Sequence, residues 1–137
     1  MKPSSNDLRS TLGRAKGWGS AKSGVGHWWY QRVTAVALVP LSVWFVYSLI
    51  TALQEPSPAG VAMWLSSPVH TVAMVLMLIA MFFHAKLGLQ VVIEDYVKCP
   101  VQKYSLLFAN NFLCIAFAVI SILAVLKLHL LDVAAGA

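Results

Sequence analysis

Three long apolar blocks divide this chain, and they limit its possible folds more than any other feature. The blocks at 33–53 and 104–126 carry no charged residue, and the block at 68–93 is interrupted only by a few polar side chains. Each block reaches the roughly 20 residues that a helix needs to cross the hydrocarbon of a bilayer. None alternates at every second residue, as the strands of a membrane barrel would. Because backbone groups in lipid must be satisfied within their own segment, the blocks predict transmembrane helices.

We therefore predict an all-α integral membrane protein with three transmembrane helices, at about 32–53, 68–95 and 104–127. The predicted organisation is a polar N-terminal tail at 1–26, a three-helix membrane domain at 27–131 and a short tail at 132–137. Segment 54–67, between the first two helices, is predicted to be a loop. The composition agrees, because only 11% of the residues are charged, against about 25% in soluble domains.

The positive charges predict the orientation of the helices. Six of the ten Lys and Arg residues precede or open the first helix, namely Lys2, Arg9, Arg14, Lys16, Lys22 and Arg32. Loop 94–103 holds Lys98 and Lys103, whereas segment 54–67 has neither Lys nor Arg. The positive-inside rule then places the N-terminus and loop 94–103 in the cytoplasm, and the C-terminus outside. This distribution explains the net charge of +5, and no nucleic-acid partner is predicted, since the basic residues do not cluster with aromatic ones.

One histidine lies deep inside the second apolar block. Asp95 and Tyr96 follow His84 by eleven and twelve residues, which is about 17 Å along a helix, or half the hydrocarbon thickness. His84 is therefore predicted at mid-depth, and Asp95 and Tyr96 at the cytoplasmic surface. A histidine in lipid is costly, so it usually has a partner such as a metal, a cofactor or a polar group.

The helical repeat places His84, Gly88 and Asp95 on one face of the second helix, since eleven residues complete about three turns. A glycine on that face allows a neighbouring helix or a flat ring to approach closely. Two interpretations of the spacing remain open. His84 is either an axial ligand of haem iron or a histidine bonded to a neighbouring helix without a cofactor.

Two stretches of the chain resemble a known family. The run His84-Ala-x-x-Gly88, followed by Val-Ile-x-Asp95-Tyr96, is similar to the signature of the hydrophobic membrane anchor of succinate dehydrogenase (respiratory complex II). The stretch Gly-Val-Gly-His27-Trp-Trp-Tyr-Gln-Arg32-Val-Thr-Ala resembles the opening of that family's first helix. The likeness covers residues 20–127, and the length and three-helix layout agree with it.

The resemblance implies a role for four residues. His84 would be one axial ligand of haem b, with the other supplied by the sister anchor, the cytochrome b subunit. Tyr96 would donate a hydrogen bond to ubiquinone, and Asp95 would lie beside that site and either deliver protons or hold the tyrosine and neighbouring basic groups. Arg32 would face the haem propionates. His27 is a weaker candidate, which would either bond a haem propionate or line the membrane interface. From the residue type alone, the default interpretation of Tyr96 is an interfacial aromatic anchor.

The resemblance also implies the partners and the reaction. A flavoprotein subunit would oxidise succinate, and an iron–sulfur subunit would pass the electrons to ubiquinone beside the two anchors. We predict no catalytic residue in this chain, because it shows no nucleophile–base arrangement and no phosphate loop. The alternatives are an anchor of a quinol:fumarate reductase and a cofactor-free membrane scaffold or assembly subunit.

The predicted location is the bacterial inner (cytoplasmic) membrane. The basic, acid-poor N-terminal segment is also compatible with a mitochondrial transit peptide, which leaves the mitochondrial inner membrane as the alternative. Four further side chains are given weaker roles. His70 is predicted at the opposite membrane interface and His129 in solvent, while Lys86 faces a polar pocket or the haem edge. Asn110 is expected to bond across helices or to loop 94–103.

Overall fold

The computed structural model describes residue 12, residues 24–52 and residues 57–135, and these contain helices and no strand. The chain order of the long elements is α2 (Gly24–Ala52), α3 (Pro58–Ser66), α4 (Pro68–Tyr96) and α5 (Pro100–Ala135). Three segments are long and apolar enough to span a membrane: Val25–Ala52, Pro68–Tyr96 and Pro100–Leu131. The predicted all-helical fold with three spanning helices is confirmed.

Proline and serine define where several helices begin. α3, α4 and α5 each start with a proline, whose missing N–H would have no partner in the first turn of a helix anyway. The Ser57 hydroxyl also accepts a hydrogen bond from the Gly60 N–H at 2.9 Å, which caps α3. Only residues 97–99 join α4 to α5, so these two helices are antiparallel neighbours.

The helices extend beyond the uncharged blocks from which they were predicted. α2 begins at Gly24 instead of 32, and α5 runs over Pro100–Ala135 instead of 104–127. The blocks mark only the apolar part of each helix, and nothing prevents a helix from continuing into polar surroundings. The prediction of a loop at 54–67 was wrong for most of that segment, because residues 58–66 form α3. The predicted polar tail lies largely outside the described residues.

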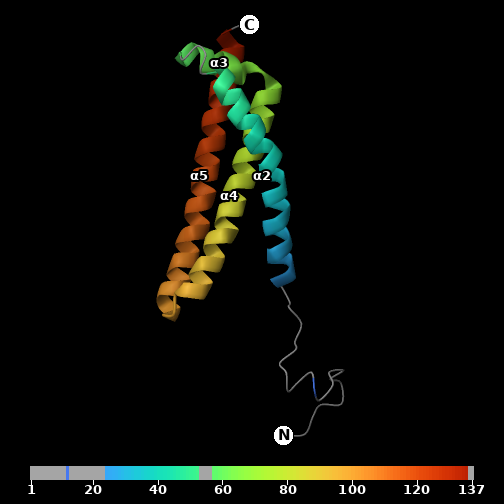
Figure 1. Ribbon diagram of the computed structural model, residues 1–137. Coiled ribbons are helices and arrows are strands. Elements are labelled where there is room, and N and C mark those ends of the chain that lie inside the picture. Colours follow the sequence, from blue (N-terminus) through green and yellow to red (C-terminus); the bar gives the residue numbers. More distant parts are fainter. Residues whose placement is uncertain (1–11, 13–23, 53–56, 136–137) are drawn as a thin grey trace, which may run out of the picture.

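α4 is the central element of the bundle. It packs against α5 on one side and α2 on the other, while α3 lies across one end (Figure 1). Within the described chain, α2 and α5 form no contact with each other. The bundle therefore has two different ends. The α3 end is covered by that helix, and the 97–99 end is where α2 begins, α4 ends and α5 begins.

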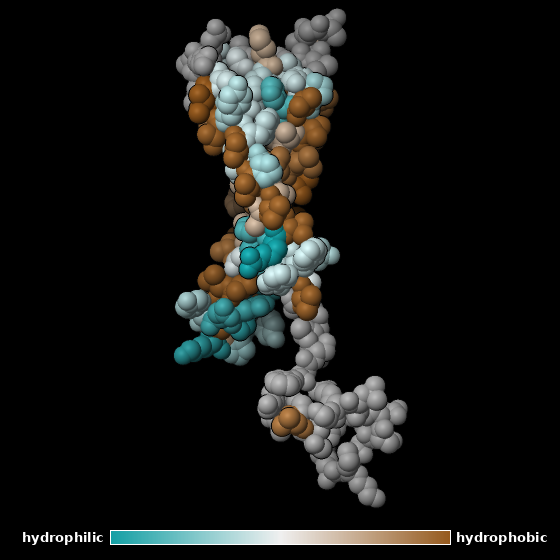
Figure 2. Space-filling view, turned by 45° about the vertical axis from the view of Figure 1, so that its right-hand side comes forward, coloured by the Kyte–Doolittle hydropathy of each residue, from teal (hydrophilic) through white to brown (hydrophobic). Residues whose placement is uncertain are grey.

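The outer surface of the bundle is apolar. Among the described residues only Leu65, Leu87, Ser48 and Thr71 are buried, and hydrophobic side chains cover much of the spanning region while hydrophilic ones gather toward the 97–99 end (Figure 2). Such a large exposed apolar surface is unsuited to water. It fits a bundle that contacts lipid and further transmembrane helices.

Candidate functional site

His84 bridges α4 to α2 through two hydrogen bonds. Its Nδ1 lies 3.0 Å from the Thr34 hydroxyl, and its Nε2 lies 3.2 Å from the Gln31 amide nitrogen. Both partners are on α2, one turn apart, so they meet the two nitrogens of a single imidazole. Next to this contact, the Tyr30 and Phe83 rings pack edge to face with their centroids 6.0 Å apart. This packing holds the two helices in register.

The surroundings of Thr34 determine which nitrogen of His84 carries the proton. The Thr34 hydroxyl lies 2.8 Å from the Tyr30 carbonyl and 3.1 Å from the Gln31 carbonyl. Its single proton is donated to these carbonyls, so the oxygen accepts from the Nδ1–H of His84. In the neutral ring Nε2 then carries the lone pair and accepts from the Gln31 amide. This is the tautomer in which Nε2 is available to a metal.

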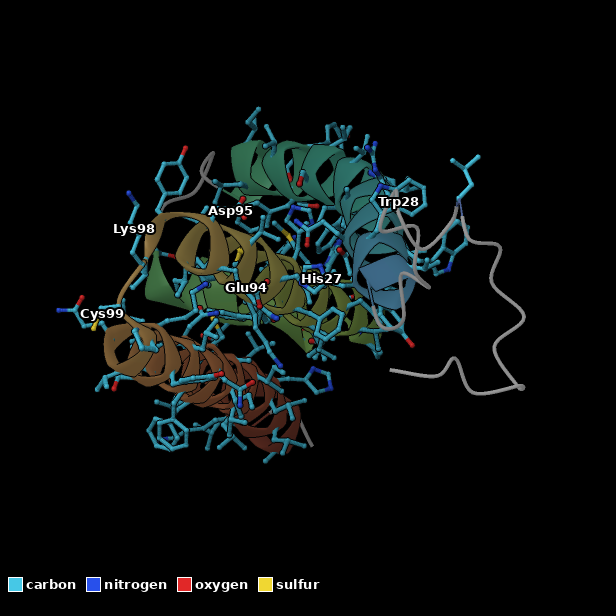
Figure 3. All side chains as sticks on the ribbon, turned by 90° about the horizontal axis from the view of Figure 1, so that it is seen from below. His27, Trp28, Glu94, Asp95, Lys98 and Cys99 are labelled. Atoms are coloured by element: carbon cyan, nitrogen blue, oxygen red, sulfur yellow. The ribbon has the colours of Figure 1, made fainter. Side chains whose placement is uncertain are left out.

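A cavity of about 660 Å³ opens beside this contact, between α2 and α4 toward the 97–99 end. Its lining residues are His27, Trp28, Gln31, Gly88, Gln90, Val91 and Glu94. Figure 3, which views the bundle from this end, shows His27 and Glu94 between the two helices and Lys98 and Cys99 on the far side of α4. Gln31 is shared, because it both lines the cavity and holds His84.

Two buried polar atoms at this cavity have no hydrogen-bond partner within the described chain. They are Nε2 of His27 and Oε1 of Gln31. A buried polar atom without a partner is unfavourable and usually marks a ligand, a water or a functional role. Gly88 lines the same cavity, and a Cβ there would meet the Gln31 amide nitrogen at an ordinary contact distance of 3.6 Å. The Gln31 side chain therefore lies directly against Gly88 at this wall of the cavity.

The other predicted site residues lie at the end of α4 or on the outside of α2. Tyr96 is 80% exposed, and Asp95 is exposed as well. The exposed Arg32 guanidinium lies 5.3 Å from the centroid of the Trp28 ring, one aromatic side chain away from the cavity. The structure thus brings His84 and His27 to one interface, and Tyr96 is exposed and does not line the cavity.

Sequence reasoning missed three residues of the site: Gln31, Thr34 and Glu94. Gln31 and Thr34 are polar side chains one turn apart at the start of an apolar helix, which is the available signal, but the sequence does not show that they face His84. Glu94 lines the cavity, and its carboxylate accepts a hydrogen bond from the Gln90 amide at 2.8 Å. The Glu94 carbonyl also accepts from the Lys103 ammonium at 2.7 Å, which ties the end of α4 to α5.

The described residues contain no group of three or more His, Cys, Asp or Glu side chains that could hold a metal ion. His84 is therefore not part of a multi-residue metal-binding group in the described chain. The cavity next to His84 and the two polar atoms without a partner leave room for a polar-edged group between α2 and α4.

The two histidines at the α3 end have partners inside the chain. His129 Nδ1 donates to the Leu65 carbonyl at 2.8 Å and lies 3.2 Å from the Thr71 hydroxyl. His70 Nδ1 donates to the Trp64 carbonyl at 3.0 Å, and its ring stacks on Trp64 with centroids 4.8 Å apart. The prediction of a solvated His129 was wrong, because α5 continues past residue 127 and carries this side chain against α3.

Lys86 and Asn110 mark the contact between α4 and α5. The Asn110 amide donates to the Lys86 carbonyl at 3.0 Å, which confirms the predicted bond of Asn110 across helices. The Lys86 side chain lines a cavity of about 320 Å³ between the two helices, with mainly apolar neighbours. It does not line the cavity beside His84.

Comparison with known proteins agrees with this architecture. The family described as "Succinate dehydrogenase/Fumarate reductase transmembrane subunit" matches residues 6–126. A succinate dehydrogenase hydrophobic membrane anchor subunit of Rickettsia bellii is 38% identical over 120 residues, covering 87% of this chain and 94% of that protein. Its counterpart in Rickettsia conorii is 34% identical over 118 residues, covering 86% and 94%. A succinate dehydrogenase membrane anchor subunit of Reclinomonas americana is 30% identical over 78 residues, covering 56% and 65%.

No solved structure matches the chain significantly. The family match nevertheless spans most of the chain, and the relatives that carry the same name match it over nearly their whole length. Such a subunit works within a membrane complex and is not itself catalytic. The chain belongs to the family of succinate dehydrogenase and fumarate reductase transmembrane subunits, as a membrane anchor subunit of succinate dehydrogenase.

Proposed function

We propose that this chain supplies one axial ligand of a haem b and one side of a ubiquinone site in succinate:quinone oxidoreductase. The ligand is His84, and the quinone contact is Tyr96 with Asp95 beside it. The proposal combines the family membership with the geometry of the two helix faces. Succinate oxidation is the proposed direction, because the relatives described above are named as succinate dehydrogenase subunits.

The hydrogen bonds of the His84 ring are the main observation that supports this proposal. Its Nδ1–H donates to the Thr34 hydroxyl oxygen, and its Nε2 accepts only from a side-chain amide beside a cavity. Release of Nε2 requires only that Gln31 turn into the adjoining space.

The residues around the cavity fit a haem in their chemistry. When bound, the haem supplies a one-electron redox centre within the membrane. His84 Nε2 would hold the iron from this chain, and a histidine of the sister anchor, the cytochrome b subunit, would supply the other ligand. The unpartnered Nε2 of His27 can hold a propionate, and the guanidinium of Arg32, now over Trp28, is suited to the same carboxylates.

The end of α4 is suited to a quinone. The Tyr96 phenol is 80% exposed, so it can donate to a quinone carbonyl that gains negative charge during reduction. The neighbouring Asp95 carboxylate is exposed and can pass protons from water. Lodged between this end and the iron–sulfur subunit, ubiquinone would receive electrons that originate on the flavoprotein subunit.

The uncovered apolar faces of the bundle leave room for the sister anchor. The charge distribution of the sequence supports an orientation with the 97–99 end in the cytoplasm and the α3 end outside. The proposed location is the inner membrane of a bacterium, in agreement with the Rickettsia relatives.

The test is the reduced-minus-oxidised optical spectrum of the purified complex, recorded together with a gel that shows which polypeptides are present. We expect a b-type spectrum in the wild type and its loss in His84→Ala, because the iron loses one axial ligand. His129→Ala is the matched control, since it removes an imidazole at the α3 end and should leave the spectrum intact. A wild-type complex without a b-type spectrum, or an unchanged spectrum in a fully assembled His84→Ala complex, would contradict the proposal.

A further inference from the structure

We propose that Thr34 is a positioning residue for His84, which holds the ring in its Nδ1–H tautomer when Nε2 binds iron, whereas Gln31 covers Nε2 only until the ligand arrives. This inference rests on the proposed haem ligation and assigns a role on α2 that the sequence motifs do not define. It divides the two contacts of one imidazole into a permanent contact and a replaceable one.

The Thr34 contact is built into the backbone of α2. Its hydroxyl donates to the carbonyls of the preceding turn, at 2.8 Å to Tyr30 and 3.1 Å to Gln31. A threonine in a helix often forms this bond, which restricts its side-chain rotation. The oxygen is therefore held in place and has only its acceptor side left for the Nδ1–H of His84.

The Gln31 contact is of a different kind. The distance between its amide nitrogen and Nε2 is 3.2 Å, which is long for such a bond. The amide oxygen has no partner in the described chain, and the side chain borders the cavity. Displacing this amide breaks one weak hydrogen bond and allows its oxygen, which has no partner in the described chain, to form a hydrogen bond elsewhere.

The edge-to-face pair of Tyr30 and Phe83 keeps the permanent contact in register. Tyr30 supplies the carbonyl that fixes the Thr34 hydroxyl, and Phe83 directly precedes His84. Each ring is thus next to one member of the Thr34–His84 bond. This packing does not depend on Gln31, so the ring orientation can persist after Gln31 leaves.

Donation from Nδ1–H makes Nε2 a stronger electron donor to a bound metal. For haem iron this favours the ferric state and lowers the reduction potential. Removing the acceptor should therefore raise the potential of the haem without removing its ligand. A residue that only packs the helices would not produce this shift.

The experiment compares Thr34→Val and Thr34→Ser in the whole purified complex, by redox titration of the haem. Val matches the shape of Thr without the hydroxyl, and Ser keeps the hydroxyl. We expect Thr34→Val to raise the ferrous-to-ferric ratio at a fixed potential about tenfold, which is 59 mV for a one-electron couple. Thr34→Ser should stay close to the wild type. Loss of haem from Thr34→Val with retention in Thr34→Ser would equally support the role of the hydroxyl.

Three results would overturn the inference: an unchanged potential in Thr34→Val, a shift in Thr34→Ser as large as in Thr34→Val, or loss of haem from both variants. Failure of the proposed function looks different, because then the wild type has no b-type spectrum or His84→Ala keeps it. If the b-type spectrum is lost in His84→Ala but the haem potential is unchanged in Thr34→Val, this inference is wrong and the proposed function still holds.

Discussion

The two ends of the bundle use histidine in opposite ways. At the α3 end, His129 donates to the Leu65 carbonyl next to Thr71, and His70 stacks on Trp64 while donating to its carbonyl. Every one of these partners belongs to the chain itself. At the 97–99 end, His27 has a buried nitrogen without a partner in the described chain, and His84 is held on one side by a movable amide.

The difference separates two histidines whose described partners lie within the fold from two that the proposed function assigns to haem. The α3 end contains three of the four buried residues of the described chain, Leu65 and Thr71 together with Ser48, whereas the 97–99 end contains a cavity of about 660 Å³. We infer that substitutions at the α3 end change stability and that substitutions at the 97–99 end change redox function.

The comparison first requires that the two ends face different aqueous phases. α5 ends at the α3 end (Figure 1). A reporter enzyme that is active only outside the cytoplasm should therefore be active when fused to the C-terminus, and this result is all-or-none. A reporter inserted between residues 97 and 99 should give the opposite signal. A cytoplasmic signal from the C-terminal fusion would reverse the orientation and place the proposed quinone residues on the wrong side.

The second prediction concerns Tyr96 at the functional end. Tyr96→Phe removes the phenolic donor, and loss of one such donor typically lowers a rate about 100-fold. Quinone reduction by the complex should fall by that order, while succinate oxidation measured with a soluble dye stays close to normal. Tyr104→Phe is the matched control, because Tyr104 is similarly exposed near the start of α5. Equal loss of both activities in Tyr96→Phe would show that the variant damages assembly instead of quinone binding.

The sequence predicted the spanning helices because their apolar blocks match the thickness of a bilayer. It failed at segment 54–67, where α3 lies, since a nine-residue helix leaves no long block and is recognisable only by Ser57 and Pro58 at its start. It also failed for His129, whose place depends on how far α5 continues beyond its uncharged part. Both errors lie outside the long apolar blocks, where hydropathy no longer determines the structure.

The helical repeat placed site residues only on α4, although His27 on α2 was also a candidate and does line the cavity. The depth of His84 and the shared face of His84 and Gly88 follow from the helical repeat. The partners on α2 do not, because no periodic signal in an apolar helix shows which of its polar side chains meets a given residue about fifty positions away. Thr34 and Gln31 became visible only when the packing of α2 on α4 was known.

The third prediction tests the structural end. Thr71 is 5% exposed, and its hydroxyl donates to the Leu65 carbonyl at 2.6 Å. Thr71→Val keeps the shape but removes this bond, which should lower the stability of the complex by about 1 kcal/mol. Thermal unfolding in detergent measures the effect. The haem spectrum should not change, and Thr51→Val, which removes only a local bond to the Ser48 carbonyl, should have less effect. A changed spectrum in Thr71→Val would contradict the assignment of stability to the α3 end and of redox function to the 97–99 end.

The smallest expected effect belongs to Gln31, and it tests whether the functional end is held ready for its ligand. Gln31→Leu removes the amide that competes for His84 Nε2, and a long hydrogen bond of this kind is worth about 0.5 kcal/mol. Haem-depleted complex carrying Gln31→Leu should therefore take up haem about twofold more tightly than the wild type, as measured by optical titration. The potential of the bound haem should remain near the wild-type value, because iron replaces the Gln31 amide at Nε2 when haem binds. Weaker uptake would mean that Gln31 contacts the bound haem, and the distinction between a replaceable and a permanent partner of His84 would then fail.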